Sequence, residues 1–295
     1  MRLVRSLFTA VAAAWLSVGC GGGGGGGTGT LSLRMTDGPF PATDGCLTAA
    51  EIDIDRVDVQ GSSGFVQIPL TGGVGGVVTL DLLQLRSGLD ASLALGSLPT
   101  GTYHQIRLHI VDTRLIFTDG SPTRSFKVPS GMQSGLKINV QPNFAIATGQ
   151  TTPLLIDFDL SSSFHVTGTG GDPDCADLKL GENQVIFNPV IHAVNTDQTG
   201  IVSGVVSDAS AVPAGDAEVT AFLAGTVVDA TTVPVVTTFS APAGLLVPEG
   251  SYAMHLDPGS YDLYVRAQGA TDRTLAASAV AVSTGALVTE DLTLP

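Results

Sequence analysis

The stretch GSYAMHLDPGSYDLYV, residues 250–265, gives the clearest indication of the fold. Apolar and polar side chains alternate on both sides of the turn Asp257-Pro258-Gly259, as expected for strands with one buried face. The expected inward-facing residues are Tyr252, Met254 and Leu256 on one strand, and Tyr261, Leu263 and Val265 on the other. A Pro-Gly turn between two alternating runs predicts a β-hairpin.

The sequence around this stretch has the same character. Residues 199–295 hold many short runs rich in Ala, Val and Thr, beginning with Ile201–Val206. Their number and spacing predict a small β-sandwich.

Residues 30–195 also follow a period of two. Ile106, Leu108 and Ile110 alternate with Gln105, Arg107 and His109, which places the polar side chains on the opposite face. The apolar phase slips near Asp55-Arg56, which indicates a bulge. Residues 81–95 are the one region with a leucine pattern that suits a short helix, although Gly88 weakens it. We therefore predict an all-β chain with two β-sandwich domains in tandem, at 30–195 and 199–295.

The N-terminus follows the logic of export. Arg2 and Arg5 precede a short apolar segment, and Leu16-Ser17-Val18-Gly19-Cys20 resembles the lipobox of bacterial lipoproteins, although that motif favours leucine where Ser17 stands. The resemblance implies that residues 1–19 are a signal peptide, that Cys20 carries a diacylglyceryl lipid with chains such as palmitate, and that the glycine-rich residues 20–29 are a tether. The alternative is an ordinary secretory signal with a coincidental cysteine.

The odd number of cysteines agrees with a lipid on Cys20. The chain has three cysteines, and assigning Cys20 to the lipid leaves Cys46 and Cys175. An oxidising compartment favours a disulfide between them, and two separate buried thiols are the alternative.

Composition limits the classes of partner. The chain has 13 basic and 27 acidic residues and a net charge of −14, which argues against nucleic acid and against an anionic lipid surface as ligands of the folded part. Beyond the first 20 residues no apolar run is long enough for a second membrane span. We expect a monomer in the bacterial cell envelope, held by its lipid at the outer membrane or periplasmic face.

Several blocks in residues 30–194 resemble the bacterial and archaeal lipoprotein domain known as domain of unknown function 4382. They are Leu33–Pro39, Asp81–Leu85, Leu98–Leu108, Val128–Ile138 and Leu155–Asp159. Residues from 199 resemble carboxypeptidase-regulatory-like domains through Gly200–Asp208 and Leu256–Leu263. The second resemblance implies a transthyretin-like or carbohydrate-binding-like sandwich, and neither implies an activity.

Motifs for catalysis are weak. Ser134-Gly135-Leu136-Lys137 spells Ser-x-x-Lys, but the alternation that begins at Lys137 indicates a strand, where residues three apart point to opposite faces. The five histidines form no metal-binding pair at helical spacing. We expect no catalytic site and no cofactor.

Two kinds of binding residue remain as candidates. Asp172, Asp174 and Asp177 crowd one loop beside Cys175 and are candidate calcium ligands, with a solvated acidic face as the alternative. The candidates for stacking on a sugar are Tyr264, which is out of phase with Leu263 and Val265, and then Tyr103. Alternation places Tyr103 on the polar side of Ile106 and Leu108, so both rings are expected to be exposed. The sequence thus predicts a non-catalytic lipoprotein that binds or presents carbohydrate or a surface protein. The first alternative is a purely structural spacer or adhesion module. A more distant alternative is an uncharacterised hydrolase.

Overall fold

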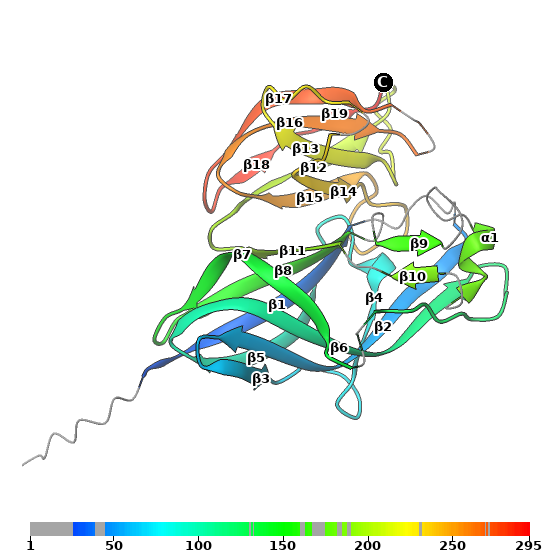
Figure 1. Cartoon of the computed structure of the whole chain (residues 1–295). Helices are drawn as coiled ribbons and strands as arrows, with labels where there is room; N and C mark the ends of the chain where they lie inside the picture. The colour runs from blue at the N-terminus through cyan, green and yellow to red at the C-terminus, as the bar shows by residue number, and fades with distance from the viewer. Residues whose placement is uncertain are drawn as a thin grey trace, which may run out of the picture.

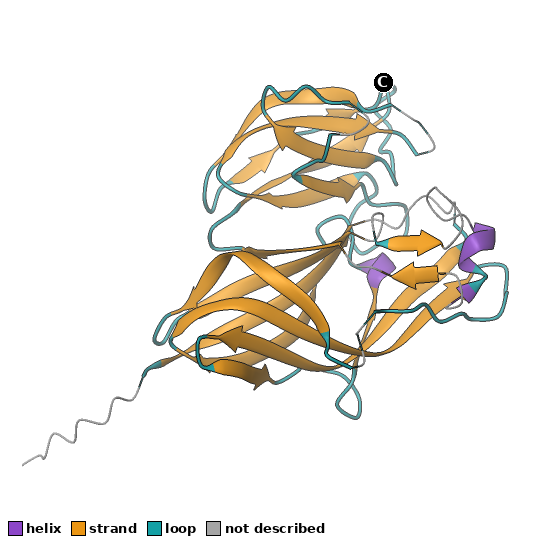
Figure 2. Ribbon diagram, in the orientation of Figure 1, coloured by secondary structure: helices purple, strands orange, loops and turns teal. Residues whose placement is uncertain are grey.

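A computed structural model describes residues 26–38, 45–129, 131, 133–159, 163–166, 175–181, 185–187, 190–229, 232–268, 270 and 272–295. The chain is nearly all β, with 59% strand and 3% helix, which confirms the predicted fold class. Figure 2 shows two bodies of strands, one above the other, with helices confined to short pieces at the side of the lower body. No helix among these residues is long and apolar enough to cross a membrane.

The lower body, the first unit, consists of two sheets that face each other (Figure 1). One sheet has the order β11-β8-β1-β5, and the other has the order β3-β2-β6-β7 with β4 paired to β2. The bounds of the first sheet are β11 Val190–Asn195, β8 Thr151–Asp159, β1 Thr28–Gly38 and β5 Ala91–Pro99. Those of the second are β3 Gly64–Ile68, β2 Leu47–Gly61, β6 Gly101–Phe117, β7 Leu136–Ile146 and β4 Val78–Asp81.

Short elements complete the first unit. β9 (Phe164–Val166) pairs with β10 (Val185–Phe187), and α1 (Cys175–Leu178) lies beside them. One hydrophobic cluster fills the space between the sheets, and it includes Leu31, Ile52, Ile106 and Phe158.

The upper body, the second unit, is also built from two sheets. One has the order β15-β12-β18, with β19 on β12, and the other has the order β14-β13-β16-β17. The bounds are β12 Gly200–Ser207, β13 Glu218–Leu223, β14 Val236–Phe239, β15 Ser251–Leu256, β16 Gly259–Arg266, β17 Thr274–Val282, β18 Leu287–Thr289 and β19 Leu292–Thr293. A separate hydrophobic cluster includes Val202, Tyr252, Met254 and Leu263. Each unit therefore has its own core.

The predicted hairpin at residues 250–265 is wrong in its pairing. β15 pairs with β12, whereas β16 pairs with β13 and β17 in the opposite sheet. The turn at Asp257-Pro258-Gly259 therefore carries the chain from one sheet to the other. The expected inward faces are correct, because Tyr252 and Tyr261 are both 2% exposed and point into the same core.

The leucine-rich region, where the sequence suits a short helix weakened by Gly88, forms a single helical turn. A 3₁₀ turn, η1 (Leu82–Gln84), is capped by the Asp81 side chain, which accepts from the Leu83 amide. Ser87 and Gly88 then take positive φ values of 63° and 82°, which end any helix, and β5 begins at Ala91. The bulge predicted near Asp55-Arg56 is confirmed by a register shift between Ile54 and Arg56 opposite β6.

The segment between η1 and β5 belongs to the first unit and contacts the second unit. Arg86 Nη1 lies 2.7 Å from Asp216 Oδ1, and the Ser87 hydroxyl donates to the Phe239 carbonyl at 2.8 Å. A Cβ on Gly88 would lie 2.6 Å from the Cβ of Ala253, so the backbone of the first unit packs directly on β15 of the second.

The chain enters the first unit at the end far from the second unit (Figure 1). β1 starts at Thr28, where Thr30 donates to the Gln150 carbonyl at 2.8 Å. A Cβ on Gly29 would lie 2.3 Å from the Ala147 carbonyl oxygen, which explains why glycine is needed there.

Candidate functional site

The outer face of the β3-β2-β6-β7 sheet carries a flat field of polar side chains. The apolar residues of these strands point to the core, so the residues between them point outward. Cross-strand partners arrange the outward residues in three rows, which we call the polar platform. The rows are Phe65-Gln60-Gln105-Asn139, Gln67-Asp58-Arg107-Lys137 and Arg56-His109.

Side-chain contacts link four members of the first two rows. Gln105 Nε2 donates to Asn139 Oδ1 at 2.8 Å, and Arg107 Nε donates to Gln105 Oε1 at 3.0 Å. The Arg107 guanidinium lies over the Phe65 ring, 4.0 Å from its centroid, in cation–π geometry. These four side chains are thus held by one another before any ligand arrives, which lowers the entropic cost of binding.

The third row is anchored by an acid. Arg56 Nε lies 3.1 Å from Asp58 Oδ2, and His109 Nε2 lies 3.4 Å from the same oxygen. Arg56 also hydrogen-bonds to the ring of His109, which is 8% exposed. Asp58 therefore contacts both side chains of the third row.

The outer residues of the platform remain accessible to a ligand. Phe65 is 43% exposed, and Gln67, Lys137 and Asn139 are exposed. Amide side chains can both donate to and accept from hydroxyl groups, and Arg107 and Lys137 add cationic donors. The platform therefore suits a hydroxyl-rich ligand that lies flat across the strands.

The other half of the same face is acidic, and its three carboxylates share one arginine. Arg114 contacts Glu51 at 2.8 Å, Asp53 at 2.9 Å and Asp112 at 2.6 Å. These hydrogen bonds raise the pKa of Arg114, and its guanidinium holds the pKa of Asp53 below its usual range. The guanidinium occupies the place that a cation would take, and the described residues contain no cluster of three metal ligands.

A second candidate lies between the two units. A cavity of about 120 Å³ is lined by β1, β8 and β11 of the first unit and by β12, β14 and β15 of the second. Its polar lining includes Asp157 and His255, and burial lowers the pKa of His255, whose Nδ1 lies 3.0 Å from the Thr199 hydroxyl. Apolar residues such as Leu155 and Met254 form much of the wall. The cavity is too small for more than a compact group.

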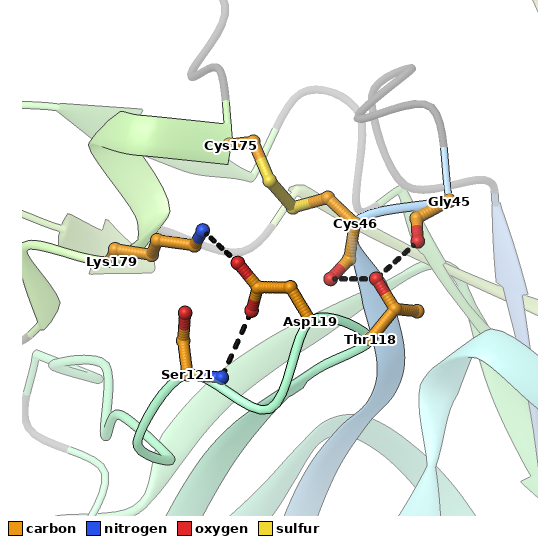
Figure 3. Close-up of a disulfide and its surroundings, with 7 residues drawn as sticks. All are labelled: Gly45, Cys46, Thr118, Asp119, Ser121, Cys175 and Lys179. Carbon is orange, nitrogen blue, oxygen red and sulfur yellow. Dashed lines mark hydrogen bonds and ion pairs between the residues drawn. A yellow bond between two sulfur atoms is a disulfide. The ribbon is translucent and has the colours of Figure 1, made fainter.

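The expected disulfide is present in the structure. Cys46 and Cys175 are joined with their Cα atoms 6.0 Å apart, within the usual range (Figure 3). The bond fixes α1 to the start of β2. Beside it, Lys179 Nζ pairs with Asp119 at 2.6 Å, and the Thr118 hydroxyl donates to the Gly45 carbonyl at 2.7 Å. The Lys179 ammonium holds the pKa of Asp119 well below its usual range.

The two sugar-stacking candidates lie in different surroundings. Tyr103 is 3% exposed, and its hydroxyl donates to the Pro99 carbonyl at 2.8 Å, so the expected exposure of this ring is wrong. The register of β6 shifts around His104, which moves Tyr103 to the core face. Tyr264 is half-buried and packs edge-on against Phe222, with ring centroids 5.4 Å apart.

The remaining predicted site residues are only partly described. Cys20, Asp172 and Asp174 lie outside the described residues, and Asp177 lies in α1. Ser134 lies in a turn and Lys137 in β7, where Lys137 belongs to the polar platform, so the pair does not share a helix. His104 is exposed, and it lies on neither the platform nor the cavity wall.

Part of the platform can be predicted from the sequence. Alternation placed Gln105, Arg107 and His109 on one face, and the structure confirms that arrangement. It did not reveal that β2 and β7 flank β6, so Gln60 and Asn139 were not recognised as neighbours. Matching polar alternation in three strands is the pattern that could have found them.

Comparisons with solved structures give only distant likenesses. The TIE protein of Bacillus anthracis is 11% identical with a TM-score of 0.25, and the alignment covers 90% of this chain and 34% of that one. BcpA, the major pilin subunit of Bacillus cereus, is 11% identical with a TM-score of 0.21, and the alignment covers 90% of this chain and 70% of that one. The shaft pilin SpaA of Lactobacillus rhamnosus GG is 12% identical with a TM-score of 0.21, and the alignment covers 91% of this chain and 100% of that one. The chain thus spans about a third of the TIE protein, and TM-scores this low carry no argument about function.

The sequence comparisons concern the first unit. No curated protein matches the chain. The match to a family model ends inside the first unit, and the predicted resemblance of residues 199–295 to carboxypeptidase-regulatory-like domains stays a prediction. Residues 28–172 match the model of DUF4382, a domain of unknown function, and this part of the chain is similar to that family.

Proposed function

We propose that this chain is a non-catalytic lipoprotein of the cell envelope that binds carbohydrate through the polar platform. The observation that carries the proposal is the set of cross-strand rows on β3, β2, β6 and β7, in which four amide side chains face outward: Gln60, Gln67, Gln105 and Asn139. Sugars offer many hydroxyl groups, each both donor and acceptor, and amides match both roles.

The contacts within the platform support binding rather than mere solubility. Solvated surface side chains are ordinarily free to rotate, and ordering them on binding costs about 0.5–1.5 kcal/mol each. Here Gln105 and Arg107 are already held by Asn139 and Phe65. The ligand therefore meets a surface that is largely in its binding arrangement.

The path of the chain supports presentation at a membrane. β1 begins at the end of the first unit that lies far from the second unit (Figure 1). A lipid on Cys20 would thus hold the first unit nearest the membrane and the second unit beyond it. The same geometry favours a structural spacer as the second candidate function, since the units are docked through Arg86 and Gly88.

A glycan array with the full-length protein in detergent tests the binding proposal. We expect signal for a subset of glycans and its loss in the variant Gln67→Ala/Asn139→Ala, whose side chains are exposed and whose replacement leaves the core intact. Gln150→Ala, in an exposed turn away from the platform, is the matched control. The absence of any signal favours the spacer, whereas loss of signal in Tyr264→Ala alone would move the site to the second unit.

The anchor is tested separately by the intact mass of the protein in the membrane fraction. We expect a mass increase from the lipid that disappears in Cys20→Ala, together with release of the protein from the membrane. A membrane-bound Cys20→Ala protein with unchanged mass would contradict the lipoprotein assignment.

A further inference from the structure

We infer that the ligand of the polar platform is an acidic polysaccharide, whose carboxylates lie against Arg107 and Lys137. This inference rests on the proposed function and names the class of sugar. It concerns the charge of the ligand, which the amide side chains of the platform do not specify.

The platform is basic in a strongly acidic protein. It holds Arg56, Arg107 and Lys137 against the single carboxylate of Asp58. The whole chain has only 13 basic residues and a net charge of −14. The other half of the same sheet face reverses the balance, with Glu51, Asp53 and Asp112 around Arg114. Charge is therefore segregated along β2 and β6, and a chain bearing carboxylates is attracted to one half only.

Two of these cations are direct neighbours across a strand pair. Arg107 and Lys137 are Cα partners in the register of β6 and β7, and both side chains point outward. Like charges directly opposite each other in a sheet are destabilising. Among the described residues, neither cation has a carboxylate within ion-pair distance, although every other arginine from Arg34 to Arg114 has one. A bound anion between them would remove the repulsion.

The geometry of Arg107 fits this role. Its Nε donates to Gln105, and Phe65 supports one face of the guanidinium, so the terminal nitrogens remain as donors. A carboxylate accepts two parallel hydrogen bonds from such a planar group. The exposed Lys137 ammonium adds a mobile charge beside it.

Other anionic polymers fit less well. Nucleic acid presents a denser row of phosphates than two or three cations can neutralise, and the rest of the protein repels it. A phospholipid surface offers the four amides far fewer hydroxyl groups than a polysaccharide does. A uronic acid polymer supplies both groups, with hydroxyls for the amides and carboxylates for the cations.

The test compares polymers that differ only in charge. Binding of the full-length protein to polygalacturonate is measured against fully methyl-esterified polygalacturonate, which has the same backbone without the charge. We expect at least tenfold tighter binding to the acid form and a loss of affinity as salt is raised from 50 to 300 mM. Polyglutamate and phosphatidylserine vesicles, which carry negative charge without hydroxyl groups, should bind at least tenfold more weakly.

Variants identify the surface. Lys137→Gln should weaken binding to polygalacturonate about fivefold or more, with no fall in melting temperature because it removes a like-charge neighbour. Lys127→Gln, an exposed lysine outside the platform, should leave binding unchanged. Equal binding of the esterified polymer would overturn the charge inference while leaving the proposed function standing. Equal binding of polyglutamate or vesicles would overturn the sugar class, and no binding of any polysaccharide would overturn both proposals.

Discussion

Tyr103 and Tyr261 have the same structural role in the two units. Each hydroxyl donates to a carbonyl four residues earlier, that of Pro99 and that of Asp257, at 2.8 Å in both cases. Each ring is buried in the core of its unit. Sequence shows the similar Gly-Thr-Tyr and Gly-Ser-Tyr starts, but it assigns Tyr103 to the wrong face because the register shift at His104 reverses the alternation. A register shift of one residue moves the side chains of a strand to the opposite face, so alternation alone then assigns the wrong face.

His255 should make the stability of the protein depend on pH near neutrality. Burial lowers its pKa, so the folded state keeps the ring neutral where the unfolded chain, with a pKa near 6.5, takes up a proton. The unfolded state then binds more protons, and the free energy of unfolding falls as the pH drops through 6.5 towards the lowered folded value. Urea unfolding at pH 7.5 and pH 5.5 measures the difference.

A variant separates this effect from general acid sensitivity. His255→Gln should lose less stability than the wild type between the two pH values, whereas His104→Gln, which changes an exposed ring, should behave as the wild type. If all three proteins lose the same free energy, titration of His255 does not contribute.

At the scale of elements, alternation predicts which residues face inward but not which strands pair. β15 and β16 show the same pattern whether they lie side by side or face each other across the core, and the structure has them facing. The same limit applies to the leucines of residues 81–95, of which the 3₁₀ turn includes only Leu82 and Leu83. Leu82, Leu85 and Leu93 all reach the same core, although they come from a 3₁₀ turn, a loop and a strand. The same spacing of apolar residues can therefore bring side chains to a core from a helical turn, a loop or a strand.

The disulfide should contribute strongly to the stability of the first unit. Cys46 and Cys175 are separated by 129 residues, and closing a loop of that length in the unfolded chain is worth about 4–5 kcal/mol in the entropy model. Cys46→Ser/Cys175→Ser should therefore lower the free energy of unfolding in urea by several kcal/mol. Asp119→Asn, which removes the exposed ion pair beside the bond, should have little effect. An unchanged unfolding midpoint in the double variant would contradict this account.

At the scale of the whole molecule, the sequence shows where its composition changes but not how the two hydrophobic cores pack against each other. The change of composition near residue 198 and the turn residues there mark the boundary between the two cores. The contact between units depends on Ser87 and Gly88, whose positive φ values bring backbone against Ala253. A glycine in a leucine-rich stretch indicates a helix stop and gives no sign of a distant partner. The platform was only partly predictable for the same reason, because strand order is set by the fold as a whole.

Gly88→Ala should destabilise the contact between the units. The new Cβ would lie 2.6 Å from the Cβ of Ala253, so one unit has to shift, and overpacking of this kind typically costs about 1–3 kcal/mol. Gly76→Ala is a matched control, because Gly76 has a φ of 86° against 82° for Gly88 and no atom within 4 Å of its added Cβ. Both variants carry the backbone strain, and only Gly88→Ala carries the clash. We expect a lower free energy of unfolding for Gly88→Ala than for Gly76→Ala, and faster proteolysis of residues 196–199 between the units. Equal behaviour of the two variants would mean that the units are not held together at Gly88.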